Sequence, residues 1–214
     1  MTKADEFRGL STATISDALD RLGIPGSCHG VSPLFNEAVL CGPAFTVRYV
    51  PTGLPKGTVG DFLDDVPPGA IVVIDNYGRT DCTVWGDIMT TLAVERGVGG
   101  TVIDGVCRDV MKAIKLQYPA YTRGRFMRTG KDRVELAEIN GTVSIGGVRV
   151  RPKDILVGDA NGVVVVPGER AAEVAEIARG IESVENDIIS AIAEGASLRM
   201  ARQRFGYHTL QRST

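Results

Sequence analysis

The sequence predicts an α/β fold whose centre is a strand–helix–strand unit. Two apolar runs, residues 70–74 and 101–103, have the length of buried strands, and an aspartate follows each at once, Asp75 and Asp104. Between them, a loop is expected over residues 76–81, and from Asp87 apolar side chains recur every three and four residues until a glycine-rich stretch stops the pattern, as in a helix. A helix that connects two strands in this way indicates that they are parallel. Both strands then end at the same edge of one sheet.

The residues before this unit predict one helix, one strand and one short helix. Ser11 or Thr12 can cap the first helix, whose apolar side chains repeat with helical spacing up to a glycine. Apolar and other residues alternate over 44–50, which favours a strand. Thr58 can cap a short helix over 59–65, before a proline–glycine turn leads into the central unit.

The residues after the unit predict a helix followed mostly by β structure. The spacing over 110–116 favours a helix, and 120–128 is expected to form an irregular strand. Three dipeptides typical of hairpin turns follow at 140–141, 146–147 and 161–162, each between apolar or alternating runs.

A long helix is expected from about residue 169 to residue 194. Its apolar side chains follow a near-heptad pattern, at Val174, Ile177, Ile181, Val184, Ile188 and Ile192. This stripe can pack onto the protein's own sheet, which we favour, or form a contact between subunits. The tail carries Arg199, Arg202, Arg204 and Arg212 without an acid, and it is either a solvated end or a segment that reaches another subunit. We treat residues 1–214 as a single domain whose C-terminal helix and tail start at about residue 168.

The composition excludes several classes of function. The 214 residues are 43% hydrophobic and carry a formal charge of -2, which gives no electrostatic case for nucleic acid as the main partner. No apolar run approaches the roughly 20 residues of a membrane span. The first residues lack the features of a secretory signal, and the four cysteines form no CxxC pair, so we expect a cytoplasmic protein with reduced thiols.

Acidic residues and one arginine gather at the expected carboxyl edge of the sheet, where open α/β sheets bind their ligands. The candidates for this cleft are Asp75, Asp81, Asp87, Asp104, Arg108 and Asp109. Clustered carboxylates require a positive charge between them, and oxygen ligands with only two histidines in the chain suit Mg²⁺ or Mn²⁺ rather than zinc. The alternative is a set of helix caps and surface ion pairs, for which Asp87 at a helix start is the strongest case.

Two further features of this stretch can carry chemistry. The backbone amides of Ile88 and Met89 have no intrahelical acceptor and can bind a carboxylate or phosphate, as the start of any helix can. Cys107 lies beside Arg108 and is either a thiolate with a lowered pKa or, as we favour, a small buried side chain. The sequence contains no nucleophile elbow and no phosphate-binding loop.

The spacing of Asp87, twenty residues, and then Arg108-Asp109 resembles the signature of a known family. It is similar to that of the metal-dependent 4-hydroxy-4-methyl-2-oxoglutarate/4-carboxy-4-hydroxy-2-oxoadipate aldolases of the RraA-like family, which also contains regulators of ribonuclease E. Three stretches look typical of this family: STATISDALD at 11–20, GGTVIDGVCRD at 99–109 and DANGVVVVP at 159–167.

The resemblance implies a layered β/β/α sandwich similar to phosphohistidine swivelling domains, assembled into a trimer or hexamer with sites at subunit interfaces. It implies that Asp109 ligates Mg²⁺ (or Mn²⁺) and that Asp87 holds a metal-bound water. Arg108 would contact the C2 oxygen of pyruvate, and the amides of Ile88 and Met89 would bind its carboxylate. The implied reaction cleaves a 4-hydroxy-2-oxo acid to pyruvate through a metal-stabilised enolate, with oxaloacetate decarboxylation as a side activity.

Two departures from the family pattern bear on the function. The regulator branch lacks the acid at the position of Asp87 and has a further acid after the Arg-Asp pair, whereas Val110 follows here, which favours an aldolase. The aldolases also use a glutamate from a neighbouring subunit, and only Glu194 is available for that role in the C-terminal region here. The first alternative is therefore a protein that binds and inhibits an RNA-degrading enzyme. The second is a quinone methyltransferase, for which the sequence lacks a glycine-rich nucleotide loop.

Overall fold

The computed structural model describes residues 2–210, and its centre is a mixed sheet. The strand order is β1-β5-β4-β3-β2-β9-β10, and β6 pairs with β2 beside this path. The strands are β1 (Ser32–Pro33), β2 (Leu40–Pro51), β3 (Ile71–Thr83), β4 (Gly100–Cys107), β5 (Ala120–Arg125), β6 (Val134–Ile139), β7 (Val143–Ile145), β8 (Val148–Val150), β9 (Ile155–Asp159) and β10 (Gly162–Val166). The helices are α1 (Thr12–Arg21), α2 (Asp87–Glu95), α3 (Val110–Lys115), α4 (Ala171–Ala193) and α5 (Leu198–Arg204), with short 3₁₀ turns η1 (Lys3–Phe7), η2 (Phe62–Asp65), η3 (Gly168–Arg170) and η4 (Tyr207–Thr209).

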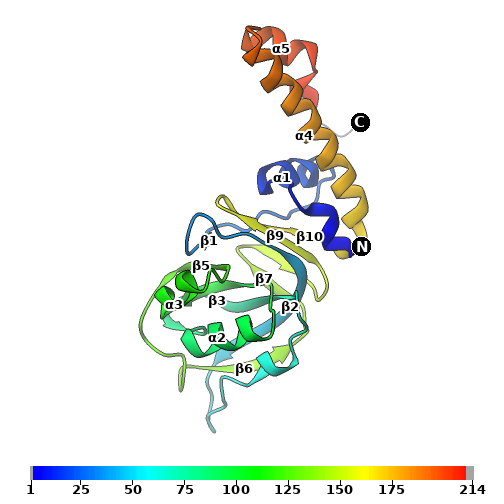
Figure 1. Ribbon diagram of the computed structural model, residues 1–214. Helices are drawn as coiled ribbons and strands as arrows, with labels where there is room; N and C mark the ends of the chain where they lie inside the picture. The colour runs from blue at the N-terminus through cyan, green and yellow to red at the C-terminus, as the bar shows by residue number, and fades with distance from the viewer. Residues whose placement is uncertain (1, 211–214) are drawn as a thin grey trace.

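The predicted strand–helix–strand unit is confirmed. β3 and β4 are parallel, with Ile71 opposite Gly100 and Asp75 opposite Asp104, and α2 connects them. β5 continues the parallel arrangement beside β4. The carboxyl ends of these strands therefore lie at one edge, where α2 and α3 begin (Figure 1).

Strand β2 joins the two parts of the sheet. Its first residues pair with β9, from Leu40 opposite Gly158 to Pro43 opposite Ile155. Its later residues pair in parallel with β3 and in antiparallel with β6. One strand therefore ties the parallel unit to the β9–β10 hairpin.

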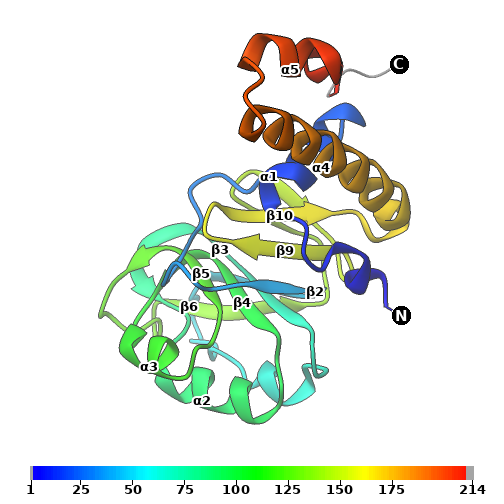
Figure 2. The same ribbon diagram turned by 45° about the horizontal axis from the view of Figure 1, so that its top comes forward.

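Three apolar cores separate the layers of the molecule. The first lies between α2, α3 and one face of the parallel strands, where Val72, Ile74 and Trp85 are buried. The second lies on the opposite face, beneath the β7–β8 and β9–β10 hairpins. The third packs α1, η1 and the first half of α4 onto the outer face of β9 and β10 (Figure 2). The result is a mixed α/β fold with helices on both outer faces.

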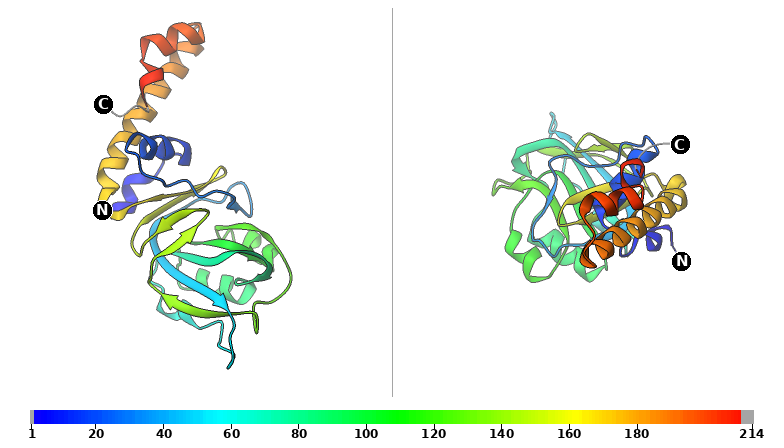
Figure 3. Two further views of the ribbon diagram at one scale, coloured as in Figure 1. Left: turned by 180° about the vertical axis from the view of Figure 1, so that it is seen from behind. Right: turned by 90° about the horizontal axis from the view of Figure 1, so that it is seen from above.

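The apolar stripe of α4 packs onto the protein's own sheet, as predicted, but only over the first half of the helix. Val174 and Ile181 are buried in the third core, whereas Ile188 packs against α5. Beyond that point α4 projects away from the sheets, and Ile189 is 63% exposed (Figure 3). The tail residue Arg212 lies outside the described residues. Within the described part, no helix is long and apolar enough to cross a membrane.

The predicted loop at residues 76–81 is wrong. These residues belong to β3, which continues to Thr83 with two register shifts against β4, and Tyr77 takes a positive φ of 53° in the first irregularity. β4 likewise runs through Asp104 to Cys107. The apolar runs end at Asp75 and Asp104, but backbone pairing continues through the polar residues beyond them.

The predicted hairpin at residues 140–141 is also wrong. β6 pairs with β2, and β7 pairs with β8, so Asn140 and Gly141 connect strands of two different sheets. The hairpin at 146–147 is confirmed, and both glycines have the positive φ that such a turn requires. The β9–β10 hairpin is confirmed with its turn at residues 160–161, one residue earlier than expected.

The helix caps are confirmed in part. Ser11 caps α1 by accepting a hydrogen bond from the Thr14 amide at 3.0 Å. Thr58 does not cap a helix, because the 3₁₀ turn η2 begins only at Phe62, after Asp61. Asp159 also supports the start of α1, since its carboxylate accepts from the Thr12 amide at 2.9 Å and from the Thr12 hydroxyl at 2.8 Å. Two of the three family-like stretches therefore meet at this contact.

Candidate active site

The structure brings Asp87, Arg108 and Asp109 together at the carboxyl edge of the parallel strands. Asp87 is the first residue of α2, and Arg108-Asp109 connect β4 to α3. An Asp109 carboxylate oxygen, Oδ2, lies 3.2 Å from the Arg108 Nε and accepts a long hydrogen bond of 3.4 Å from the Asp87 amide. Arg108 is anchored through its own amide, which donates to the Trp85 carbonyl at 3.0 Å. The twenty residues between Asp87 and Arg108 therefore span α2 and β4, which return the chain to the same edge of the sheet.

Asp109 has a left-handed backbone conformation, with φ 55° and ψ 34°, directly before α3. Aspartate is one of the few residues that enter this region at moderate cost, and such conformations concentrate at functional sites. The turn ends β4 and sets the carboxylate beside the start of α2. The backbone thus fixes the direction of the residue that the sequence predicts as the metal ligand.

Gly86 allows this close approach of the two helix starts. A Cβ atom on Gly86 would lie 2.9 Å from the Asp109 Oδ2 and 3.3 Å from the Arg108 Nε. Any side chain at this position would therefore displace the carboxylate. The sequence analysis did not single out Gly86, although its position directly before a helix start, beside Asp87, is a usable signal.

The start of α2 presents the backbone amides that the sequence predicts as an anion site. In this structure the Ile88 amide donates to the Asp87 Oδ1 at 2.9 Å. The Ile88 side chain is 78% exposed, whereas Met89 packs against the first core. A bound carboxylate would therefore take the place that the Asp87 side chain occupies here.

A cavity of about 190 Å³ lies against Asp87, Ile88, Met89 and Arg108. Its floor is the buried Trp85, whose indole Nε1 donates to the Thr90 hydroxyl at 3.0 Å and whose ring stacks on Tyr118. Two segments that the sequence analysis did not assign to the site complete the walls, and they are residues 59–61 and 129–131. Neither has a local sequence signal, because tertiary contacts bring them here: Thr129 forms a bridge with Thr83, and the Thr58 carbonyl accepts from the Leu136 amide of β6.

Carboxylate oxygens at this site fit a hard divalent cation. Among the described residues no group of three or more His, Cys, Asp or Glu side chains is arranged to hold a metal. Mg²⁺ commonly takes only one or two protein carboxylates and fills its remaining positions with water and substrate oxygens. Asp109, with Asp87 nearby, therefore fits Mg²⁺ and does not fit a structural zinc site.

The remaining acids of the expected cleft lie elsewhere, which corrects the sequence-based expectation. Asp75 and Asp104 are buried under the β7–β8 hairpin, where they accept hydrogen bonds from the amides of Ser144 at 3.1 Å and Gly146 at 3.0 Å. Arg123 neutralises Asp104 through a close ion pair. These two carboxylates dock the hairpin onto the sheet and do not face the cavity.

Asp81 forms a surface ion pair, as the alternative for the acids proposed. Both of its oxygens accept from the Arg79 guanidinium, at 2.8 and 2.9 Å. This pairing holds the pKa of Asp81 below its usual range. Asp81 is therefore not available to the cleft.

The nucleophile reading of Cys107 is not supported. Burial raises the pKa of its thiol to about 11, so it is a small buried side chain rather than a thiolate.

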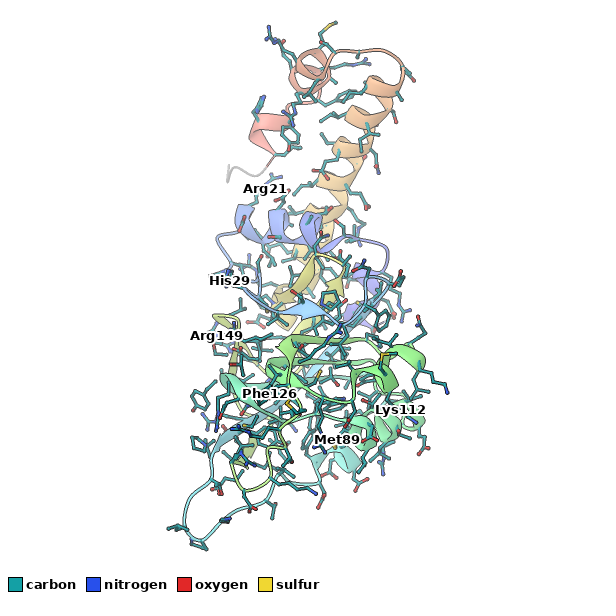
Figure 4. The ribbon with its side chains drawn as sticks, turned by 90° about the vertical axis from the view of Figure 1, so that its left-hand side faces the viewer. Arg21, His29, Met89, Lys112, Phe126 and Arg149 are labelled. Atoms are coloured by element: carbon teal, nitrogen blue, oxygen red, sulfur yellow. The ribbon has the colours of Figure 1, made fainter. Side chains whose placement is uncertain are left out.

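Figure 4 shows His29 well away from Met89 on α2 and from Lys112 on α3. Phe126, labelled in the same view, follows β5 in the half of the molecule that contains these two helices.

Comparison with known proteins gives the family. The sequence model of the RraA-like family, described as Aldolase/RraA, matches residues 12–165, which include the helix starts that carry Asp87 and Asp109. This chain belongs to the RraA-like family. The match ends near the end of β10, so α4 and α5 lie beyond it.

Relatives of the RraA-like chain carry different names. Protein DlpA of Legionella pneumophila is 40% identical over 201 residues, or 92% of this chain, and the chain spans about a third of DlpA (32%). A Halalkalibacterium halodurans protein provisionally named 4-hydroxy-4-methyl-2-oxoglutarate aldolase is 37% identical over 164 residues, covering 76% of this chain and 75% of that protein. Several further relatives carry the same aldolase name.

Solved structures support the fold of this RraA-like protein. An uncharacterised protein of Pseudomonas syringae is 44% identical, with a TM-score of 0.87 over 94% of this chain and 96% of that one. RraAS2 of Streptomyces coelicolor, described as an unusual member of the RNase ES inhibitor RraA family, is 25% identical with a TM-score of 0.77. It matches 91% of this chain and 96% of its own.

Proposed function

We propose that this protein is a divalent-metal-dependent aldolase that cleaves a 4-hydroxy-2-oxo acid and releases pyruvate. The proposal rests on Asp109, Arg108 and the start of α2 lying together, with Arg108, Asp87, Ile88 and Met89 lining one cavity beside the Asp109 carboxylate. An anionic 2-oxo acid needs positive charge and amide donors, and this wall offers both. The relatives that carry the aldolase name support the same reading.

The residues of the chain would divide the work on the substrate. The amides of Ile88 and Met89 would bind the carboxylate of the pyruvyl half. Arg108 would face the C2 oxygen and stabilise the negative charge that develops there as the C3–C4 bond breaks. Asp87 would position the water that takes the proton from the C4 hydroxyl. Loss of CO₂ from the C4 carboxylate of oxaloacetate develops the same negative charge on the C2 oxygen, so we expect that activity as well.

Asp109 would hold the cation, with Asp87 contributing through a water molecule. Mg²⁺ or Mn²⁺ at this position would supply positive charge beside the C2 oxygen of the substrate. The left-handed turn at Asp109 and the absence of a side chain at Gly86 leave its carboxylate at the helix start for this purpose.

A second candidate function, inhibition of an RNA-degrading enzyme, is supported by one structural relative. RraAS2 is described as belonging to a ribonuclease-inhibitor family, and its fold matches nearly the whole chain. In this reading the protein would bind an RNA-degrading enzyme and the cavity would have no turnover. The presence of Asp87 beside Arg108 and Asp109 favours the aldolase.

Substitution of Asp109 tests the proposal. Asp109→Ala should abolish pyruvate release from oxaloacetate in the presence of Mg²⁺, because the ligand for the cation is removed. Arg108→Ala should lower kcat/KM by roughly 10² to 10³, the usual effect of deleting one group that stabilises a developing oxyanion.

Asp81→Ala is the matched control, since it removes a surface carboxylate outside the cavity. It should retain activity. Normal Mg²⁺-dependent turnover in Asp109→Ala would contradict the proposal. Capture of a ribonuclease by a wild-type protein that shows no turnover would favour the inhibitor function instead.

A further inference from the structure

Residues 52–60 lead from β2 toward η2, and we name them the strap. Val59 and Gly60 line the cavity, and Asp61 follows them. Figure 1 shows the strap in cyan, projecting at the bottom of the molecule. Leu54 near its tip is 94% exposed, whereas Val59 at its other end packs against the first core.

One carboxylate oxygen accepts three hydrogen bonds from the strap. The Glu135 Oε2, on β6, accepts hydrogen bonds from the Thr52 hydroxyl at 3.0 Å, the Gly53 amide at 3.2 Å and the Gly57 amide at 2.9 Å. These bonds lower the pKa of Glu135, the Gly53 amide having the largest effect. The two ends of a projecting segment thus converge on one ionised group.

Further contacts fix the part of the strap that faces the cavity. The hydroxyl of the buried Tyr49 donates to the Val59 carbonyl at 2.7 Å. The Leu136 amide donates to the Thr58 carbonyl at 2.8 Å. The strap is therefore tied to β6 and β2 on both sides of the position where it becomes a cavity wall.

Two glycines of the strap, Gly57 and Gly60, pack so closely against β6 that neither has room for a side chain. A Cβ on Gly57 would lie 2.6 Å from the Glu135 Oε2, and one on Gly60 would lie 2.3 Å from a Leu136 side-chain carbon. Gly53 differs, since a Cβ there would meet no heavy atom within 4 Å. An alanine at Gly57 would therefore press on the Glu135 carboxylate, whereas an alanine at Gly53 would not.

We infer that the strap, positioned by Glu135, is the wall that contacts the distal half of the substrate and selects for it. The inference rests on the proposed function. If the pyruvyl half lies against Ile88, Met89 and Arg108, the atoms beyond C4 face residues 59–61 and 129–131. Glu135 does not line the cavity, and it acts only through the strap as a positioning residue.

The test compares two substrates that share the pyruvyl half and differ beyond it, oxaloacetate and the longer 4-hydroxy-4-methyl-2-oxoglutarate. Glu135→Ala removes the acceptor of the hydrogen bond between the Gly57 amide and the Glu135 carboxylate, and Gly57→Ala places a methyl group against that carboxylate. Glu138→Ala is the control on the same strand, because Glu138 pairs with Arg48 at 2.6 Å and does not touch the strap. Gly53→Ala is the control within the strap.

Both test variants should raise the KM for the longer substrate roughly tenfold, the loss expected for one charged hydrogen bond. Their kcat and KM for oxaloacetate should stay within about twofold of wild type, and both controls should behave as wild type. Glu135→Gln, which keeps an acceptor oxygen, should have a KM for the longer substrate close to that of wild type. Hydrogen exchange at the Gly57 amide should be faster in Glu135→Ala, independently of turnover.

Equal losses on both substrates, or an unchanged KM for the longer one, would overturn the inference while leaving the proposed function intact. A wild-type protein that releases pyruvate from neither substrate would overturn the proposed function, and the inference with it. The two failures are therefore distinguished by the wild-type rates alone.

Discussion

Gly86 is the residue on which the geometry of the candidate site depends most closely. Gly86→Ala should lower turnover of a 2-oxo acid by about tenfold or more, because the new methyl group would push the Asp109 carboxylate from its place and small misplacements at a reacting centre are costly. Steady-state kinetics would measure the loss. The backbone of Gly86 is extended, so alanine is tolerated there and the fold should remain intact.

Gly180→Ala provides the matched control for this substitution. A Cβ on Gly180, within α4, would meet no heavy atom within 4 Å. This variant should keep full activity and gain up to about 1 kcal/mol of stability, the usual difference between glycine and alanine in a helix. Unchanged kinetics in Gly86→Ala would show that the Asp109 carboxylate is not held where the account requires.

At the residue scale, the sequence predicted the site for some acids and not for others. Asp87, Arg108 and Asp109 lie together, as the sequence predicted, because they follow the ends of two neighbouring parallel strands at one edge of the sheet. Asp75 and Asp104 were misplaced because a strand ends where its hydrogen bonds end, not where its apolar residues end. The two buried carboxylates serve the β7–β8 hairpin, a tertiary contact that no local pattern indicates.

At the scale of elements, the strap makes its own prediction about pH. The folded-state pKa of Glu135 lies below its ordinary value of 4.5, so its contribution to stability is fully present above that value. The contribution is lost as the pH falls through the lower, folded-state pKa. Denaturant unfolding of wild type and Glu135→Gln from pH 7 to pH 3 would measure it.

The difference in stability between these two proteins should be constant near neutral pH and should shrink below pH 4.5. A difference that grows as the pH falls would contradict the hydrogen-bonded carboxylate. Because Glu135 is only partly buried, the sign of this change, rather than its size, is the informative result.

The elements themselves were predictable where periodicity was long or turn chemistry was strict. Helices α1, α2 and α4 and the turn at Gly146-Gly147 follow from local patterns. Asn140-Gly141 has the signature of a hairpin, yet β6 pairs with β2 instead of β7. The choice of a strand's partner depends on the rest of the sheet and is not encoded in the turn.

At the scale of the whole molecule, the surface around the candidate site predicts an assembly. Ile88 on α2, Met111 on α3 and Met127 after β5 are 78%, 72% and 74% exposed, and a contiguous apolar surface formed by such side chains would mark a contact with a partner. We propose a homotrimer or hexamer, in which Glu194 of the C-terminal region could complete the site of another copy. Analytical ultracentrifugation should give three or six times the chain mass of 22.8 kDa. A monomer at micromolar concentration would contradict this prediction.

The central claim is that a divalent cation and the Asp87–Arg108–Asp109 group together release pyruvate from a 2-oxo acid. Its most direct test is pyruvate release from oxaloacetate and from 4-hydroxy-4-methyl-2-oxoglutarate, first with Mg²⁺ and then with EDTA. We expect release of pyruvate from both substrates with Mg²⁺, and loss of this release when EDTA removes the metal. No release from either substrate by the folded protein in Mg²⁺, or release that persists in EDTA, would contradict it.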